Sequence, residues 1–373
     1  MKLAKRVNSV NPSLTLAITA RAKMLKKEGR DIVNFAAGEP DFDTPDNIKK
    51  AAIAGIRKGF TKYTPSSGTT ELKKAVMRKL KMDNGLDYEA SSISISCGAK
   101  HSLFNIFQAT CQIGDEVLIP SPYWLSYPEM VRLSGAKPVF LKTKEEDEFK
   151  INPADIKKAV NKNTKALILN SPCNPTGTVY EKDELAAIAD IAASKKILVI
   201  SDEIYERIIY DGLSHVSIAS LGNEIKKLVL LVNGVSKSYS MTGWRIGYVA
   251  GNSEIIDGIN KIQSHSTSNP SSISQMAALE AILGDQSSVD RMRKEFESRR
   301  NYVIERLSRI KGFSPVKPHG AFYVFCNITK TKTGSVVLSH RLLDEADVAV
   351  IPGKPFGSDR HIRLSFVTAE YYI

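Results

Sequence analysis

The chain has 373 residues, of which 42% are hydrophobic and 25% charged, a composition typical of a globular protein with a sizeable core. Lys and Arg exceed Asp and Glu by 52 − 40 = 12, but the basic residues are spread along the chain without a zinc-finger or aromatic-flanked basic motif. No stretch approaches the roughly 20 apolar residues that cross a bilayer, and no apolar run follows the basic N-terminus. We therefore expect a cytoplasmic protein with no nucleic-acid or membrane partner.

The cysteines offer neither a metal site nor a disulfide framework. Cys97, Cys111, Cys173 and Cys326 lie far apart, and no CxxC pair occurs. We expect reduced thiols that are mostly buried, and no metal.

The first two thirds of the chain alternate between short apolar runs and helix-like segments. The predicted strands are 92–96, 116–120, 166–170, 197–201, 228–232 and 246–250, and the predicted helices include 99–111 and 182–194. The strands are nearly continuous in Val, Ile and Leu, which is typical of a sheet covered on both faces. This alternation predicts an α/β architecture with a mostly parallel sheet.

The pattern changes after about residue 269. A charged helical stretch covers 287–311, where apolar residues recur at helical spacing. Strand-like segments follow at 321–326, 348–351 and 362–366. We expect a smaller α+β unit here, packed on the first.

The segment with the strongest chemical signal is 234–247, Gly-Val-Ser-Lys-Ser-Tyr-Ser-Met-Thr-Gly-Trp-Arg-Ile-Gly, directly after a predicted strand. An isolated lysine is ordinarily a surface residue, but Lys237 follows a buried strand. Burial lowers the pKa of an ammonium, which favours Schiff-base formation. Eight residues later, Arg245 offers a fork of donors that suits a phosphate, and Gly243 and Gly247 permit close backbone approach.

This segment resembles, position by position, the pyridoxal-phosphate attachment signature of the class I aminotransferases. Further motifs of that family occur in the expected order over nearly the whole chain. They are 34–45 with Gly38, 62–68, 97–100, 122–124, 170–177, 201–205 and 361–366. The resemblance implies fold type I of the pyridoxal-phosphate-dependent transferases, with a large domain around a mostly parallel seven-stranded sheet and a smaller α+β domain. We expect residues 46–275 to form the large domain, and residues 1–45 and 276–373 the small one.

The resemblance also implies how the cofactor, pyridoxal 5'-phosphate, is held. Lys237 would bind it as an internal aldimine, and Asp202 would pair with the pyridine nitrogen. Tyr205 and Asn174 would contact its phenolic oxygen, and Trp124 would stack on its ring. The phosphate would be bound by Gly98, Ala99, Lys100, Ser236 and Arg245, and by Tyr63 of a neighbouring subunit in a homodimer. Independently of the resemblance, Gly98, Ala99 and Lys100 open a predicted helix, whose free N–H groups suit an anion. Asp202 follows a predicted strand at the carboxyl edge of the sheet.

The implied reaction is ping-pong transamination between amino acids and 2-oxo acids, with Lys237 moving the proton and Asp202 and Tyr205 assisting. Arg363 would clamp the substrate α-carboxylate, helped by Asn174, Trp124 and the backbone of Gly38. The pattern is most similar to the bacterial aspartate aminotransferases, in which residues at the positions of Lys100 and Thr15 contact the distal carboxylate. We therefore expect aspartate and 2-oxoglutarate to be converted to oxaloacetate and glutamate.

Several alternatives remain. A broader aminotransferase could accept aromatic amino acids or prephenate, although prephenate-using relatives often carry lysine where this chain has Asn11. A C–S lyase on the same fold would keep Lys237. A transcription regulator would need an added N-terminal DNA-binding domain, for which the early position of Gly38 leaves no room. A dinucleotide-dependent dehydrogenase lacks support because no GxGxxG follows an early strand.

Two departures from the family pattern are visible. Gly234 stands where some relatives have a phosphate-contacting serine, which predicts a weaker phosphate site. Relatives also continue beyond the Arg363 strand into a final helix, whereas this chain stops at Ile373. We expect that difference to affect stability and domain closure.

Overall fold

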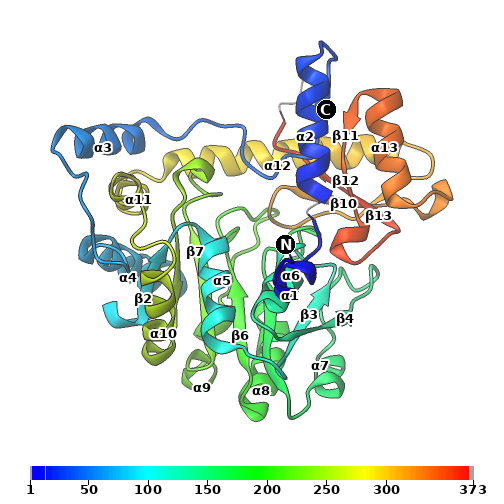
Figure 1. The fold of residues 1–373 in the computed structure, drawn as a ribbon. Helices are drawn as coiled ribbons and strands as arrows, with labels where there is room; N and C mark the ends of the chain where they lie inside the picture. Colours follow the sequence, from blue (N-terminus) through cyan, green and yellow to red (C-terminus); the bar gives the residue numbers. More distant parts are fainter. Residues whose placement is uncertain (1, 13, 369–373) are drawn as a thin grey trace.

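The computed structural model describes residues 2–12 and 14–368, and its largest element is a seven-stranded sheet (Figure 1). Its strands are β2 (Ile93–Ser96), β3 (Glu116–Ser121), β4 (Lys137–Lys142), β5 (Thr164–Asn170), β6 (Leu198–Asp202), β7 (Val229–Gly234) and β8 (Gly247–Ala250), in the order β2-β8-β7-β6-β5-β3-β4. All neighbouring strands are parallel except β8, which is antiparallel to both β2 and β7. The predicted α/β architecture is confirmed.

Both faces of this sheet are buried, which explains the continuous apolar runs. Successive strand residues point to opposite faces, so Ala166 and Ile168 belong to one core and Leu167 and Leu169 to another. The first core is covered by α5 (Ala99–Thr110), α6 (Ser126–Leu133) and α10 (Ser253–Ser264). The second is covered by α3 (Asp46–Arg57), α4 (Thr70–Asn84), α7 (Pro153–Ala159), α8 (Lys182–Lys195), α9 (Asn223–Lys226) and α11 (Ser272–Leu283).

The edge strand β4 is absent from the sequence-based prediction. It begins and ends with exposed lysines, and Leu141 is its one buried residue. Its apolar run, residues 139–141, is only three residues long and is flanked by Pro138 and two lysines, so it gives little signal.

A second, antiparallel sheet is formed by the C-terminal part of the chain. Its order is β12 (Ile351–Pro352), β13 (His361–Ser365), β10 (Tyr323–Asn327) and β9 (Ser314–Pro315). The strand predicted at 348–351 is divided in two: β11 (Val348–Ala349) pairs in parallel with β1 (Val33–Asn34), and from Ile351 the chain continues as β12 in the other sheet. Helices α12 (Ser287–Ser308) and α13 (Ser335–Ala346) pack on this part (Figure 1).

The N-terminal segment lies with the C-terminal part of the chain. After the short α1 (Lys5–Asn8), helix α2 (Leu14–Lys27) buries Ile18, Ala22 and Leu25 against the core of the smaller sheet, beside α13 (Figure 1). This packing supports the proposed grouping of the two segments into one small domain, whose proposed boundary at 275 falls within α11. The expectation about the chain end falls on residues 369–373 and beyond, outside the described residues.

The carboxyl ends of the central strands of the large sheet lie on the side of the smaller sheet. The parallel strands β5, β6 and β7 end at Asn170, Asp202 and Gly234. In open α/β sheets, ligands bind outside these carboxyl ends.

No helix among residues 2–12 and 14–368 is both long and apolar enough to cross a membrane.

Candidate active site

A cavity of about 600 Å³ lies at the carboxyl ends of these strands and reaches α2 and the smaller sheet. The sequence-predicted residues that line it are Thr15, Gly38, Ala99, Lys100, Trp124, Asn174, Asp202, Tyr205, Ser236, Lys237, Arg245 and Arg363. Gly98 lies directly behind it, as the residue before α5. Residues that are far apart in the sequence are thus brought to one cavity.

Lys237 lies in the turn after β7 and opens onto this cavity. Its Nζ donates a hydrogen bond of 2.5 Å to the carbonyl oxygen of Gly38. The pKa of Lys237 is lowered to about 8, chiefly by burial; the nearby Arg363 and Arg245 also lower it, whereas Glu39 opposes the change. The amine is therefore more easily deprotonated than an exposed lysine, as the sequence analysis expected.

Asp202 is the last residue of β6, and it is buried, with only 4% of the residue exposed. Its Oδ2 accepts a hydrogen bond of 2.7 Å from the Tyr127 hydroxyl, and its Oδ1 accepts one of 3.3 Å from the Ile204 N–H. Burial raises the pKa of Asp202 to about 6, and the hydrogen bond from Tyr127 limits the rise. A buried carboxylate beside a cavity is suited to pairing with a protonated ring nitrogen.

Tyr205 lies in the turn after Asp202, and its hydroxyl is 2.9 Å from that of Tyr323. Burial raises the pKa of Tyr205 well above its usual value, so its hydroxyl remains a hydrogen-bond donor. The Tyr323 ring in turn stacks under Arg363, at 4.3 Å from the guanidinium carbon to the ring centroid.

Arg363, on β13, is a buried cation without an acidic partner. Its Nη1 donates to Asn174 Oδ1 and its Nη2 to the Ala36 carbonyl, both at 3.1 Å, whereas its Nε has no partner. No carboxylate among the described residues forms an ion pair with it, although it is only 3% exposed. An unpaired buried charge is costly, so this side chain indicates a site for an anionic ligand.

The beginning of α5 and Arg245 form a second anion site. The first N–H groups of an α-helix have no partner within the helix, and the first two residues of α5, Ala99 and Lys100, line the cavity. Gly98 has φ 89°, and a Cβ there would lie 2.4 Å from Arg245 Nη2. The positive φ favours glycine at this position, and its lack of a side chain lets Arg245 lie against the helix end, which suits a phosphate.

The structure explains why residue 234 is a glycine, which the sequence alone did not. It pairs with Gly247 at the end of β7 and β8, and a Cβ at Gly234 would lie 2.8 Å from the Ile246 carbonyl oxygen. A serine would not fit here without a backbone shift. Ser236, two residues later, is buried and lines the cavity.

Lys100 and Thr15 lie where a second charged group of a ligand could be bound. Lys100 Nζ is 4.8 Å from the ring centroid of Trp124, and burial, together with Arg245, lowers its pKa. The Thr15 hydroxyl is buried without a hydrogen-bond partner. Thr19 and Lys23 follow it at four-residue spacing on α2 and line the same cavity. The sequence analysis missed these two, although the spacing would reveal them once Thr15 is placed on a helix.

Tyr63 is not brought to this cavity. Its side chain is 91% exposed, and its loop is held by buried glutamines: Gln263 donates to the Ser66 carbonyl and Gln275 to the Thr64 hydroxyl. The prediction that Tyr63 serves a neighbouring subunit stays a prediction.

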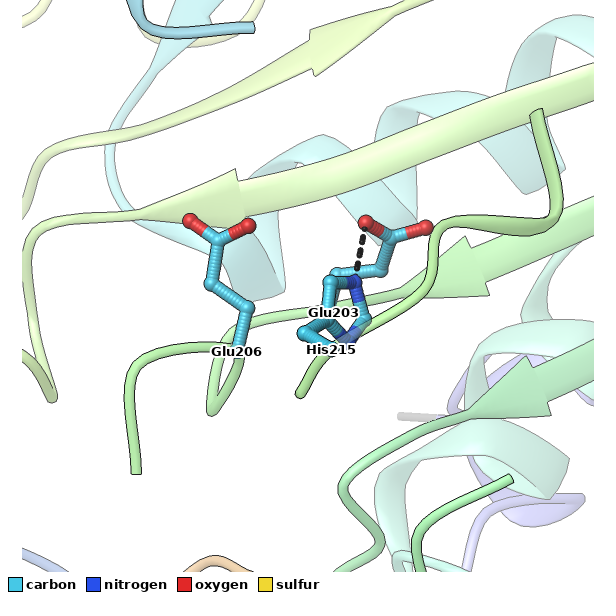
Figure 2. A group of neighbouring side chains, drawn as sticks. All are labelled: Glu203, Glu206 and His215. Carbon is cyan, nitrogen blue, oxygen red and sulfur yellow. Dashed lines mark hydrogen bonds and ion pairs between the residues drawn. The ribbon is translucent and has the colours of Figure 1, made fainter. Parts of the chain in front are cut away.

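A separate cluster of titratable side chains follows β6 in the chain and does not line the cavity. Figure 2 shows Glu203, Glu206 and His215, whose possible ligand atoms all lie within 4.8 Å of one another. His215 Nε2 is 2.8 Å from Glu203 Oε2, and Lys79 is ion-paired with Glu206. Because Lys79 already supplies the cation, this cluster is better explained as a charge-balanced anchor than as a metal site.

Tyr127 and Tyr323 were not predicted from the sequence, yet they connect residues that were. Tyr127 donates a hydrogen bond to Asp202, and Tyr323 contacts both Tyr205 and Arg363. No local pattern marks Tyr323. Tyr127 could have been noticed, because it lies three residues after Trp124 at the start of a helix.

The fold and this cavity define a class of enzyme, and comparison with known proteins identifies it. The family model for class I and II aminotransferases matches residues 30–372. The chain belongs to this family, whose class I members work with pyridoxal 5'-phosphate. The helix end with Arg245, the buried Asp202 and the amine of Lys237 fit the phosphate, the ring nitrogen and the carbonyl group of that cofactor, respectively.

Individual relatives are similar over almost the full length. The aspartate aminotransferase of Bacillus sp. (strain YM-2) is 50% identical, with 98% of this chain and 95% of the relative covered. A probable aspartate/prephenate aminotransferase of Aquifex aeolicus is 48% identical, with 99% and 95% covered. Among solved structures, the aspartate aminotransferase of Thermus thermophilus with maleate has a TM-score of 0.96 at 41% identity, covering 100% of this chain and 97% of that one.

Proposed function

We propose that this chain transfers the amino group of L-aspartate to 2-oxoglutarate, producing oxaloacetate and glutamate. The observation that carries the proposal is the buried, unpaired Arg363 in the same cavity as Lys237, with Lys100 and the unpartnered Thr15 hydroxyl as a second polar site. One cation suits the α-carboxylate that all amino acids have, and a second suits the distal carboxylate of a dicarboxylic acid. The names of the relatives agree with this substrate class.

The cofactor would be held by residues from several segments of the chain. Lys237 would hold its carbonyl group, Asp202 its ring nitrogen, and Tyr205 and Asn174 its phenolic oxygen. Trp124 would cover the ring. The phosphate would lie on Gly98, Ala99 and Lys100 with Ser236 and Arg245. When bound, the cofactor supplies an electron sink for the negative charge left after the α-proton is removed.

The chain's own residues would perform the remaining work. With a pKa of about 8, roughly a tenth of the Lys237 amine is uncharged at pH 7, far more than for an exposed lysine. That amine can take the α-proton and return it. Arg363 and Asn174, already hydrogen-bonded to each other, would fix the α-carboxylate so that the proton faces Lys237. The first 2-oxo acid leaves before the second enters, which is a ping-pong order.

The experiment that tests this proposal compares amino donors by steady-state kinetics with 2-oxoglutarate as acceptor. We expect kcat/KM to favour aspartate over aromatic and branched donors by at least tenfold. Lys100→Ala should reduce that preference, whereas Lys74→Ala, at an exposed site on α4, should leave it unchanged. Lys237→Ala should abolish turnover. Equal rates for all donors would contradict the dicarboxylate substrate, and turnover by Lys237→Ala would contradict the mechanism.

A second candidate, a broader aspartate/prephenate activity, is suggested by the names of several relatives. At the position where prephenate users often carry lysine, Asn11 donates from Nδ2 to Glu129 Oε1 at 3.2 Å. A neutral amide engaged with an acidic side chain lacks the charge that a second carboxylate would need. We therefore expect prephenate to be a poor acceptor in the same assay. Release of ammonia without consumption of a 2-oxo acid would instead indicate a C–S lyase.

We further propose a cytoplasmic homodimer with shared active sites. The exposed Tyr63 on a loop held by buried glutamines supports this arrangement, because a rigid loop with a free tyrosine is suited to reaching a neighbouring chain.

A further inference from the structure

Tyr127 is a buried tyrosine whose hydroxyl is committed to Asp202. It lies in the first turn of α6, is 2% exposed, and donates to Asp202 Oδ2 at 2.7 Å. The edge of its ring packs on Trp124, with centroids 5.3 Å apart and planes at 84°. One side chain thus contacts both residues that are expected to hold the cofactor ring.

We propose that Tyr127 is a positioning residue that orients the ionised Asp202 carboxylate toward the cofactor's ring nitrogen and supports Trp124 against the ring. This inference rests on the proposed function, and it assigns a role to a side chain outside the family motifs identified in the sequence.

The hydrogen bonds around Asp202 show why the hydroxyl matters. Among the described residues, only Tyr127 and the Ile204 N–H donate to this carboxylate. The Ile204 bond is the longer one, at 3.3 Å, and comes from a neutral backbone group two residues away. A buried carboxylate that loses one of two donors has its charged form disfavoured, and its side chain becomes free to rotate away from the ligand.

Other groups near Asp202 cannot replace this bond. Lys237 attracts the carboxylate and Glu203 repels it, but neither is hydrogen-bonded to it. The nearby Tyr205 hydroxyl is engaged with Tyr323. Burial raises the pKa of Tyr127 far above its usual value, so the phenol stays protonated and remains a donor at any working pH.

The first test is Tyr127→Phe in the holoenzyme, which keeps the ring and its contact with Trp124. We expect the dissociation constant for pyridoxal 5'-phosphate to rise about tenfold or more, since a hydrogen bond to a charged group is lost. The visible absorption of the bound cofactor should also change at fixed pH. Tyr88→Phe is the matched control, because the Tyr88 hydroxyl is buried without a partner, and it should leave both readouts unchanged.

The second test is a double-mutant cycle with Asp202→Asn, read out as cofactor affinity. If Tyr127 acts through the Asp202 charge, its substitution should weaken binding by less than about threefold in the Asp202→Asn background. An equal loss in both backgrounds, or no loss in the native one, would overturn the proposal. Because no substrate is used, the result does not depend on which amino acid the enzyme accepts. Absence of any cofactor binding by the unaltered chain would instead contradict the proposed function itself.

Discussion

At the scale of single residues, the three arginines that are buried in the described part of the chain differ in what balances their charge. Arg299 is ion-paired with Asp41 and Glu295, and Arg300 makes a bidentate contact with Asp211. Arg363 is buried to a similar degree, but among the described residues it donates hydrogen bonds only to the neutral oxygens of Asn174 and Ala36. Carboxylates of the same chain balance the charges of the first two arginines. The charge of Arg363 has no such partner among the described residues and is available to an anionic ligand.

Replacing Arg363 by lysine keeps the charge but removes the planar fork. We expect kcat/KM for aspartate to fall by about a hundredfold, since charge-assisted hydrogen bonds contribute about 1.5–3 kcal/mol. Steady-state kinetics with aspartate and 2-oxoglutarate would measure the loss. Because Arg363 is not itself among the residues that would hold the cofactor, the affinity for pyridoxal 5'-phosphate should fall far less than kcat/KM. An unaltered kcat/KM would show that Arg363 does not bind the α-carboxylate.

At the scale of elements, the end of β6 and the turn after it contribute side chains both to the cavity and to a buried ion-pair cluster. Asp202 and Tyr205 face the cavity, whereas Glu203 and Glu206 face the buried cluster of Figure 2. Lys79 reaches this cluster from α4 and is ion-paired with Glu206, with its side chain only 8% exposed. Despite burial, the charge of Lys79 lowers the pKa of Glu206 to about 2. The ion pair therefore ties α4 to the turn that positions Tyr205.

Lys79→Met should leave Glu206 as an unpaired buried charge. Breaking a buried pair in this way costs about 3–5 kcal/mol, so we expect a clear drop in the thermal unfolding midpoint of the holoenzyme. Lys74→Met on the exposed side of the same helix is the control and should shift the midpoint far less. Calorimetry or circular dichroism would measure both. Equal shifts in the two variants would show that the pair does not anchor the turn.

The elements that the sequence predicts well are those with local signals. The buried strands ending at Asn170 and Asp202 have continuous apolar runs, and Lys237 and Arg245 lie in one short motif. The contacts of Tyr127 and Tyr323 depend on how α6 and β10 are placed against β6. The local sequence could draw attention to Tyr127 through its spacing from Trp124, but it reveals neither of these contacts. The steric need for Gly234 likewise arises only when β8 pairs beside it.

At the scale of the whole molecule, the site exists only because two sheets meet. The large sheet supplies Asp202, the turn after β7 supplies Lys237, and the smaller sheet supplies Arg363 and Tyr323. Relative movement of the two sheets would change the separation between the carboxylate clamp and the amine. The exposed Tyr63 is the one predicted site residue that this arrangement leaves outside.

Mixed dimers can test whether Tyr63 completes the site of a neighbouring chain. A Tyr63→Phe chain keeps Lys237, and a Lys237→Ala chain keeps Tyr63. When the two are co-expressed with different tags, the mixed dimer should contain one site with both residues. We expect its activity per Lys237-bearing chain, at limiting cofactor, to exceed that of the Tyr63→Phe homodimer.

The control partner carries both Tyr63→Phe and Lys237→Ala, so it offers no tyrosine and should restore nothing. If Tyr63 acted within its own chain, both mixed dimers would have the same low activity, because the Lys237-bearing chain is identical in each. The comparison thus separates a shared site from a local one without relying on the stability of either variant. Restoration by the first partner alone would establish that the exposed loop of one chain reaches the cavity of another.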